Sequence, residues 1–329
     1  MNDFRTELTP RTSAFPLNLK DRIFTIGSCF ANEIGTLLVE NKFIASNNPF
    51  GAVYNPISIH QLLLFGLNGK FPEQESYSQN NEIYFNYHFH SSFSSLKRDE
   101  TESRVQNSIA EANSFLKNAD RIIITYGTAF VYKLKANNVT VANCHKMPSV
   151  NFDKSLLTES EIIKSFEEVY EALKSIKPSA KIILTVSPVR HLKDTLELNA
   201  VSKSMLRVAC HSIVERFADV EYFPAYEILL DDLRDYRFYK TDRLHPTEEA
   251  VEYIWRKFTD AYFDESTKKF INDWQKIKTD LTHKPFHAES ETHQKFLKSL
   301  LKKLETIQSL ADVQSEMVSV KSKIANQKP

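Results

Sequence analysis

Residues 22–40 read RIFTIGSCFANEIGTLLVE, and this stretch decides the fold class. Its first six residues form a short apolar run that ends at Gly27, which is typical of a buried strand. From Ala31 to Glu40 the apolar residues recur at helical spacing, so a helix is expected there. Gly27, Ser28 and Cys29 are therefore predicted to form a strand-to-helix turn.

The remainder of the chain repeats this order of strand and helix. Thr158 and Glu161 form a capping-box pattern that opens one of the helices, and residues 70–100 suggest a long loop with short strands. The predicted helices are 57–67, 103–119, 158–176, 200–217 and 247–263; the predicted strands are 121–126, 181–186 and 220–223; a hairpin is predicted over 130–134 and 139–142 with its turn at Asn137-Asn138. Alternating strands and helices predict an α/β fold with a parallel sheet.

The composition changes after about residue 264. Residues 264–329 are rich in Lys, Glu, Gln and Ser, and QKFLKSLLKKLETI at 294–307 has apolar residues at helical spacing. We therefore expect two units, a main domain over 1–263 and a helical C-terminal extension over 264–329. The extension is expected to pack on the domain or on a second subunit. Its lysines suggest a solvated helix face, with a nucleic-acid-binding tail as the minor alternative.

Charge and composition restrict the classes of partner. Lys+Arg and Asp+Glu are both 42 and hydrophobic residues make up 42% of the 329 residues. A chain without net charge has no bulk attraction for nucleic acid or an anionic membrane, so a small or neutral partner is expected. The first twenty residues have no apolar signal-peptide core, and no stretch is long enough to span a bilayer. A cytoplasmic protein is expected, although export by a missing precursor segment would leave the same sequence.

Three features that could take part in a reaction follow predicted strands. These are Ser28, Gly127-Thr128 and the run Ser187-Pro188-Val189-Arg190. In an open α/β sheet, ligands bind where the carboxyl ends of strands meet helices. A shared location at this edge favours one site built from all three.

Ser28 has two interpretations when taken alone. At a helix N-terminus the free N–H groups and the helix dipole stabilise a developing oxyanion, which suits a nucleophile. The simpler interpretation is an ordinary helix N-cap. A serine also needs a base to become nucleophilic, and Asp242-Arg243-Leu244-His245-Pro246 offers one. His245 could accept the serine proton while Asp242 orients its ring. The alternative is a surface aspartate beside an incidental histidine.

An early Gly-Ser turn combined with a late D-x-x-H resembles the SGNH (GDSL-like) hydrolases. The pentapeptide GSCFA at 27–31 further resembles the signature of the GSCFA family, an SGNH-related group of bacterial proteins. Companion segments extend this resemblance over about residues 20–260: Asn48-Pro49-Phe50-Gly51, Tyr54-Asn55-Pro56, Gly127-Thr128-Ala129, Asn143-Cys144-His145-Lys146, Ser187–Arg190 and Asp242–Pro246. The resemblance implies a three-layer α/β/α, flavodoxin-like fold and ester hydrolysis.

Carried over to this sequence, the resemblance makes Ser28 the nucleophile, His245 the base and Asp242 its partner. SGNH oxyanion holes typically use the N–H of the nucleophile, a glycine N–H that Gly51 would supply, and an asparagine side chain. This chain departs from the third motif, because Thr128 stands in the Gly127-Thr128-Ala129-Phe130 segment where an Asn is expected. The Thr128 hydroxyl or the Asn143 amide could replace that donor.

Several other residues have both a functional and a structural interpretation. Cys29 could be the nucleophile, but a small residue packed in the first helical turn is favoured. His145 could act as a second acid/base or substrate donor, and Arg190 could contact a carboxylate or phosphate. The Cys144-His145 and Cys210-His211 pairs match no common zinc spacing. We therefore expect no metal and no cofactor, and three sparse cysteines suggest no disulfide framework.

The leading hypothesis is a serine esterase or deacylase that acts on an acyl ester of a carbohydrate or other small molecule. The alternative is an acyltransferase, or a non-catalytic relative that binds an acylated ligand, with an altered oxyanion hole. A scaffold protein built on the C-terminal helices, which could join subunits into a homo-oligomer, is a third hypothesis.

Overall fold

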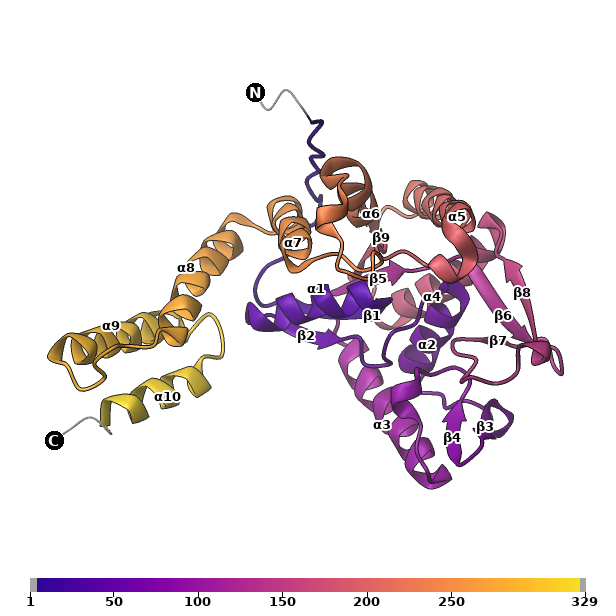
Figure 1. The fold of residues 1–329 in the computed structure, drawn as a ribbon, viewed down its shortest axis with the longest axis horizontal. Helices are drawn as coiled ribbons and strands as arrows, with labels where there is room; N and C mark the ends of the chain where they lie inside the picture. Colours follow the sequence, from indigo (N-terminus) through magenta and orange to yellow (C-terminus); the bar gives the residue numbers. More distant parts are fainter. Residues whose placement is uncertain (1–4, 326–329) are drawn as a thin grey trace.

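The computed structural model describes residues 5–325 and has a parallel five-stranded sheet at its centre (Figure 1). The elements in chain order are β1 Arg22–Gly27, α1 Cys29–Glu40, β2 Ile44–Asn47, α2 Pro56–Asn68, β3 Tyr77–Asn80, β4 Ile83–Asn86, α3 Arg98–Leu116, β5 Arg121–Tyr126, β6 Phe130–Leu134, β7 Thr140–Val141, β8 Phe152–Leu156, α4 Glu159–Ile176, β9 Lys181–Val186, α5 Thr195–Arg216, β10 Val220–Phe223, α6 Ala225–Glu227, α7 Glu248–Tyr262, α8 Glu265–Thr282, α9 Glu291–Ile307 and α10 Gln314–Ala325.

The strand order in the central sheet is β10-β9-β5-β1-β2. Numbered by their sequence, these parallel strands follow the order 2-1-3-4-5, which is that of flavodoxin-like doubly wound folds. Along the chain, β2 is added on one side of β1 and the later strands are added on the other side. The order therefore reverses between β1 and β5, which are hydrogen-bonded neighbours. That junction is the topological switch point, where such folds bind their ligands. The predicted fold class is thus confirmed.

Alternate residues of each central strand enter different cores. Ile122, Ile124 and Ile182 pack against α2–α5, whereas Ile123 and Ile183 pack on the other face against α1, α7 and the C-terminal helices. Successive side chains of a strand point to opposite faces. Because both faces are covered, a strand such as RIIITY is apolar almost throughout, and the result is a three-layer α/β/α arrangement.

Most predicted elements are confirmed, with shifted helix ends. The helix predicted at 103–119 is α3, Arg98–Leu116, and the one predicted at 200–217 is α5, which begins at Thr195. The capping box of α4 forms with both of its hydrogen bonds, and β6 and β7 pair as the predicted antiparallel hairpin. β2 and β8 were not predicted from the sequence. Both have mostly polar or exposed residues, and they are strands because β1 and β6 supply their pairing partners.

The C-terminal helices α8, α9 and α10 form an arm that projects from the sheet (Figure 1). Their apolar faces join the same core as α1 and α7. The indole N–H of Trp274 on α8 donates to the Glu40 carbonyl at the end of α1, at 2.7 Å. Packing of this extension on the main domain is therefore observed, while contact with a second subunit and the division at residue 264 stay predictions.

Candidate active site

Ser28 lies at the end of β1 and is the N-cap of α1. Its side chain accepts a hydrogen bond from Phe30 N at 3.4 Å, and the residue is 1% exposed. Its own N–H donates to the Thr125 carbonyl of β5 at 3.0 Å. Ser28 is thus held at the switch point between β1 and β5, and the simple N-cap interpretation describes its contacts in this conformation.

Asn48 holds the turn that precedes Ser28. Its Oδ1 accepts from Gly27 N at 3.0 Å, and its Nδ2 donates to Gly27 O at 3.2 Å and to Asn32 Oδ1 at 2.8 Å. One side chain therefore binds both backbone groups of Gly27 and the first turn of α1. Asn48–Gly51 is one of the segments that resemble the GSCFA family. The hydrogen bonds of Asn48 to Gly27 could not be predicted, because the two residues are more than twenty positions apart and no local pattern indicates the contact.

Asp242 and His245 form the expected pair. His245 Nδ1 lies 2.7 Å from Asp242 Oδ2, and Asp242 Oδ1 accepts from the N–H groups of Leu244 at 2.8 Å and His245 at 3.0 Å. The hydrogen bond from His245, followed by those from the two N–H groups, holds the pKa of Asp242 far below its usual value. An ionised Asp242 fixes the hydrogen of His245 on Nδ1, so Nε2 is the basic nitrogen.

The His245 loop is attached to the same edge of the sheet as Ser28. Arg190, in the segment that follows β9, donates its N–H to the Leu244 carbonyl at 3.2 Å. The Arg190 guanidinium lies 3.9 Å above the Tyr239 ring, on the loop that leads to Asp242. Arg190 is thus brought together with the pair. Across residues 5–325, however, no hydrogen bond joins the Ser28 hydroxyl to His245.

The expected oxyanion donors are engaged in other bonds. Gly51 N–H donates to the Asn48 carbonyl at 2.9 Å, so its expected role would require that bond to break. The Thr128 hydroxyl lies 3.0 Å from Ser202 Oγ on α5 and accepts from Phe130 N, so it links β5 to α5. The Ser28 N–H, as stated, is used by Thr125. By contrast, Cys29 N lies in the first turn of α1, where an N–H has no intrahelical acceptor.

Asn143 and His145 lie with the small sheets. The Asn143 side-chain oxygen accepts from His145 N at 2.8 Å. The His145 ring stacks on Phe85 of β4 with centroids 4.2 Å apart, and its Nε2 donates to the Asn86 carbonyl at 2.9 Å. Burial lowers the pKa of His145 to about 4. Neither residue has a hydrogen bond to Ser28, Asp242 or His245 within the described part of the chain.

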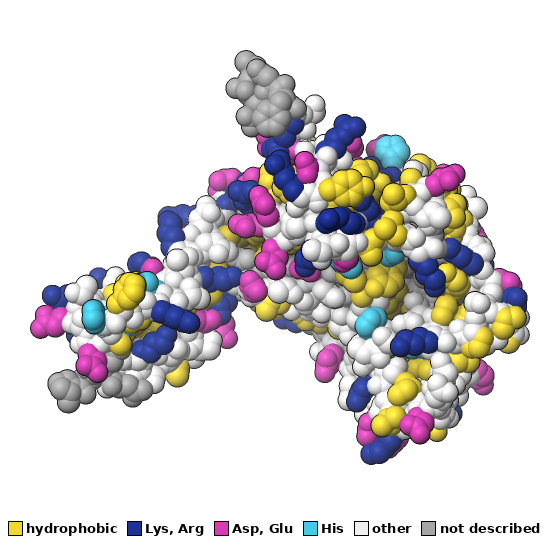
Figure 2. Space-filling model, in the orientation of Figure 1, with side chains coloured by type: hydrophobic (Ala, Val, Ile, Leu, Met, Phe, Trp, Pro, Cys, Tyr) yellow, Lys and Arg dark blue, Asp and Glu magenta, His cyan; other side chains and the backbone are white. Residues whose placement is uncertain are grey.

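Tyr54 and His191 also lie at this edge, and no role was predicted for either from the sequence. The Tyr54 hydroxyl is 3.4 Å from Cys29 Sγ, and its ring packs edge-on against His191 with centroids 5.4 Å apart. A Cβ on Gly127 would lie 3.2 Å from both residues, so the glycine admits this close approach. His191 directly follows Arg190, and that adjacency was the available signal. Near the start of α1, Figure 2 shows histidine and apolar side chains around a hollow.

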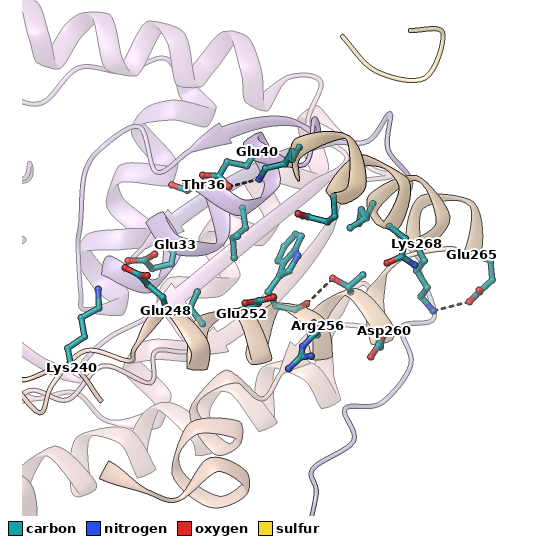
Figure 3. Close-up of a pocket in the computed structure, with 18 residues that line it drawn as sticks. Glu33, Thr36, Glu40, Lys240, Glu248, Glu252, Arg256, Asp260, Glu265 and Lys268 are labelled. Carbon is teal, nitrogen blue, oxygen red and sulfur yellow. Dashed lines mark hydrogen bonds and ion pairs between the residues drawn. The ribbon is translucent and has the colours of Figure 1, made fainter. Parts of the chain in front are cut away.

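A cavity of about 800 Å³ lies between α1, α7 and α8 (Figure 3). Its wall carries Trp255 and charged side chains such as Glu33, Glu248 and Arg256. None of the predicted site residues lines it. The three cysteines are free. In residues 5–325 no group of three or more His, Cys, Asp or Glu is arranged to hold a metal, and no helix is long and apolar enough to cross a membrane.

Comparison with known families identifies the chain. The profile of the GSCFA family matches residues 22–258. The chain belongs to the GSCFA family. A second profile, the C-terminal domain of GSCFA domain proteins, matches residues 274–326. The resemblance found in the motifs is thus confirmed, and a comparison with curated proteins found no match.

Similar solved structures are distant in sequence and in shape. A candidate platelet activating factor from Streptococcus pneumonia is 14% identical with a TM-score of 0.39, covering 74% of this chain and 85% of that one. A carbohydrate esterase family 3 protein from Talaromyces cellulolyticus is 12% identical with a TM-score of 0.32, over 77% and 99%. The acetyl xylan esterase Est2A from Butyrivibrio proteoclasticus is 12% identical with a TM-score of 0.28, over 81% and 66%. Likeness at this level does not indicate the activity of this chain.

Proposed function

We propose that this GSCFA protein is a serine esterase or deacylase that acts on an acyl ester of a carbohydrate or other small molecule. The observation that carries the proposal is the 2.7 Å bond between Asp242 and His245. It lies on a loop that is hydrogen-bonded to the segment after β9, at the same sheet edge as Ser28. A serine, an oriented histidine and an ionised aspartate are the parts of a hydrolytic triad.

The reaction follows from these roles. His245 Nε2 takes the proton of Ser28 while Ser28 Oγ forms a bond to the ester carbonyl carbon. The C–O bond to the alcohol then breaks, and the alcohol leaves with that proton. Water, deprotonated by His245, attacks the acyl carbon; the bond from that carbon to Ser28 Oγ breaks, Oγ takes the proton back from His245, and the acid is released. Since Ser28 is buried against Phe30 N, its hydroxyl must rotate toward His245 when substrate binds; catalytic hydrogen bonds often tighten only in the complex.

The oxyanion needs N–H donors that are not already used. We assign the Cys29 N–H as one donor, because Cys29 lies next to Ser28 in the first turn of α1, where an N–H has no intrahelical acceptor. Gly51 and Thr128 stay as further candidates whose present hydrogen bonds would have to break first. Asn143 stays as a third candidate, and its side-chain oxygen is bonded to His145 N. Loss of one such donor costs on the order of 10²–10³ in rate, so a slow esterase is expected.

Those occupied donors also favour a second candidate function. A site whose polar groups are already bonded and whose serine is buried suits an acyltransferase, or a protein that binds an acylated ligand without hydrolysing it. If the protein is an acyltransferase, an added sugar acceptor would become acylated while little free acid is formed. Measuring both products in one assay separates transfer from hydrolysis.

The direct test is hydrolysis of p-nitrophenyl acyl esters of increasing chain length by the wild type and by Ser28→Ala. We expect the wild type to turn over at least one of them, and Ser28→Ala to lose kcat by at least about 10³-fold. Equal turnover by the two proteins would contradict the proposal.

Ser290→Ala is the matched control, because Ser290 is also a helix N-cap and accepts from His293 N on α9. Removal of an N-cap serine costs about 0.5–2 kcal/mol of stability. If Ser28 were only a cap, both variants would show this loss and neither would lose activity.

A further inference from the structure

Lys203 on α5 is a buried lysine whose ammonium contacts backbone rather than a carboxylate. The residue is 1% exposed, and its Nζ donates to the carbonyl oxygens of Gly127 and Ser187, each at 2.7 Å. Burial lowers the pKa of Lys203 to about 7. Burying an amine is costly compared with an apolar side chain of the same length. Packing of α5 on the sheet does not by itself require such a residue.

The two carbonyls mark the point where neighbouring strands separate. β5 and β9 pair as far as Tyr126 and Val186, and Ser187 N donates to Tyr126 O at 2.8 Å. Beyond this bond the chain after β5 continues into β6, whereas the chain after β9 continues toward the His245 loop. Lys203 contacts the first carbonyl after each strand, and so it bridges two segments that the sheet no longer joins.

Each bridged segment leads to one half of the candidate site. The N–H groups of Gly127 and Thr128 donate to the Tyr54 carbonyl at 2.7 and 3.0 Å, and the Tyr54 hydroxyl contacts Cys29, next to Ser28. On the other side, the segment that begins at Ser187 reaches Arg190, whose N–H is bonded to Leu244, the neighbour of His245.

We infer that Lys203 is a positioning residue of the candidate site: it ties the segments after β5 and β9 together and so sets the separation of the Ser28 turn and the His245 loop. The inference rests on the proposed function. Lys203 contacts no reacting atom in this role. Its effect is on the alignment of nucleophile and base, where a displacement of about 1 Å can lower the rate about 10²-fold.

The test replaces Lys203 by Met, an unbranched side chain one atom shorter that has no donors. With a p-nitrophenyl ester, we expect kcat to fall roughly 10- to 100-fold while KM changes little, since the groups that contact substrate are intact. Lys174→Met is the matched control. Lys174 Nζ also binds backbone carbonyls, of Pro178 at 3.0 Å and Ala180 at 2.6 Å, but at the amino edge of β9, where it also pairs with the Asp219 carboxylate at 2.6 Å. It should lose stability without losing kcat.

A second readout does not depend on esterase activity. Iodoacetamide labelling of Cys29, followed by peptide mass spectrometry, reports whether Tyr54 still covers the thiol. We expect faster labelling in Lys203→Met than in the wild type or Lys174→Met. Should the wild type prove inactive on every ester, the proposed function fails, and this labelling still tests whether Lys203 bridges the segments after β5 and β9. If Lys203→Met does not fold, Lys203→Leu, which also removes the donors, is measured instead. Unchanged kcat and unchanged Cys29 labelling in a folded variant would overturn the inference.

Discussion

Gly27 is the residue on which the nucleophile turn most directly depends. Its φ of +137° is one that side-chain-bearing residues rarely adopt, and a Cβ there would lie 2.1 Å from the Thr125 carbonyl. That carbonyl belongs to the neighbouring strand and accepts the Ser28 N–H. The glycine is therefore required both by its backbone conformation and by the closeness of β5 to the start of α1.

Gly27→Ala is expected to destabilise the protein by at least about 2 kcal/mol, because strain and a backbone overlap add. Gly69→Ala is the control: Gly69 is left-handed at φ +63°, but a Cβ there would lie 3.4 Å from its nearest neighbour, Asn113. It should cost about 1 kcal/mol, from strain alone. Urea unfolding of both variants measures the difference, and equal losses would argue against the overlap.

The C-terminal helices are joined to the sheet domain mainly through α8 and α1. Trp274 is 3% exposed and shares a core with Leu38 and Phe43, at the end of α1 and just after it. Its hydrogen bond to the Glu40 carbonyl satisfies one of the acceptors that a helix C-terminus leaves unpaired. Lys42 adds an ion pair to Glu316 of α10 at 2.6 Å.

Trp274→Ala is expected to lower the free energy of unfolding by about 3–5 kcal/mol, from lost burial and the cavity left behind. Trp274→Phe should lose less, about 1–3 kcal/mol, because it keeps an apolar ring and leaves only the Glu40 carbonyl without its donor. Denaturant unfolding followed by circular dichroism distinguishes the two. An unchanged midpoint for Trp274→Ala would mean that α8 does not pack on α1.

At the scale of the whole molecule, buried histidines connect the layers. His60 of α2 lies 2.6 Å from the Tyr126 hydroxyl of β5 and 2.9 Å from Ser165 Oγ of α4. Burial raises the pKa of Tyr126 well above 10, so the phenol keeps its proton. The tautomer of His60 sets which partner donates in each of these two hydrogen bonds. In either tautomer His60 links β5 to α4, so this Ser-His pair is a structural bridge.

These histidines make stability depend on pH. Burial lowers the pKa of His60 to about 3 and that of His88 to about 4, from 6.5. Between these values and 6.5 the unfolded chain binds protons that the folded protein does not, so stability is complete above pH 6.5 and declines as the pH falls toward 4. The loss is on the order of 1 kcal/mol per pH unit for each histidine.

Unfolding in urea at pH 7, 6 and 5 measures this slope. His60→Gln should reduce it by the share of one histidine, even though the variant is less stable overall. His287→Gln, at an exposed position, should leave the slope unchanged. If His60→Gln and the wild type had the same slope, the pKa of His60 would not differ between the folded and unfolded states.

The sequence by itself determined the α/β class, the buried strands and the residues that could do chemistry. These signals are local: an apolar run that ends in glycine, helical spacing, a capping box, and motifs at strand ends. Family resemblance joined Ser28 to Asp242 and His245, which are separated by more than two hundred residues. The polar strands β2 and β8 were missed because their pairing partners, rather than their own residues, make them strands.

Only the tertiary structure decided the strand order, which places Ser28 at the switch point between β1 and β5. It also decided which backbone donors are occupied, and it brought Asn48 to Gly27, Tyr54 to His191 and Lys203 to two separate strand ends. Such contacts join positions tens of residues apart. They follow from where the sheet places its neighbouring strand ends, and no periodicity or spacing along the chain encodes that placement.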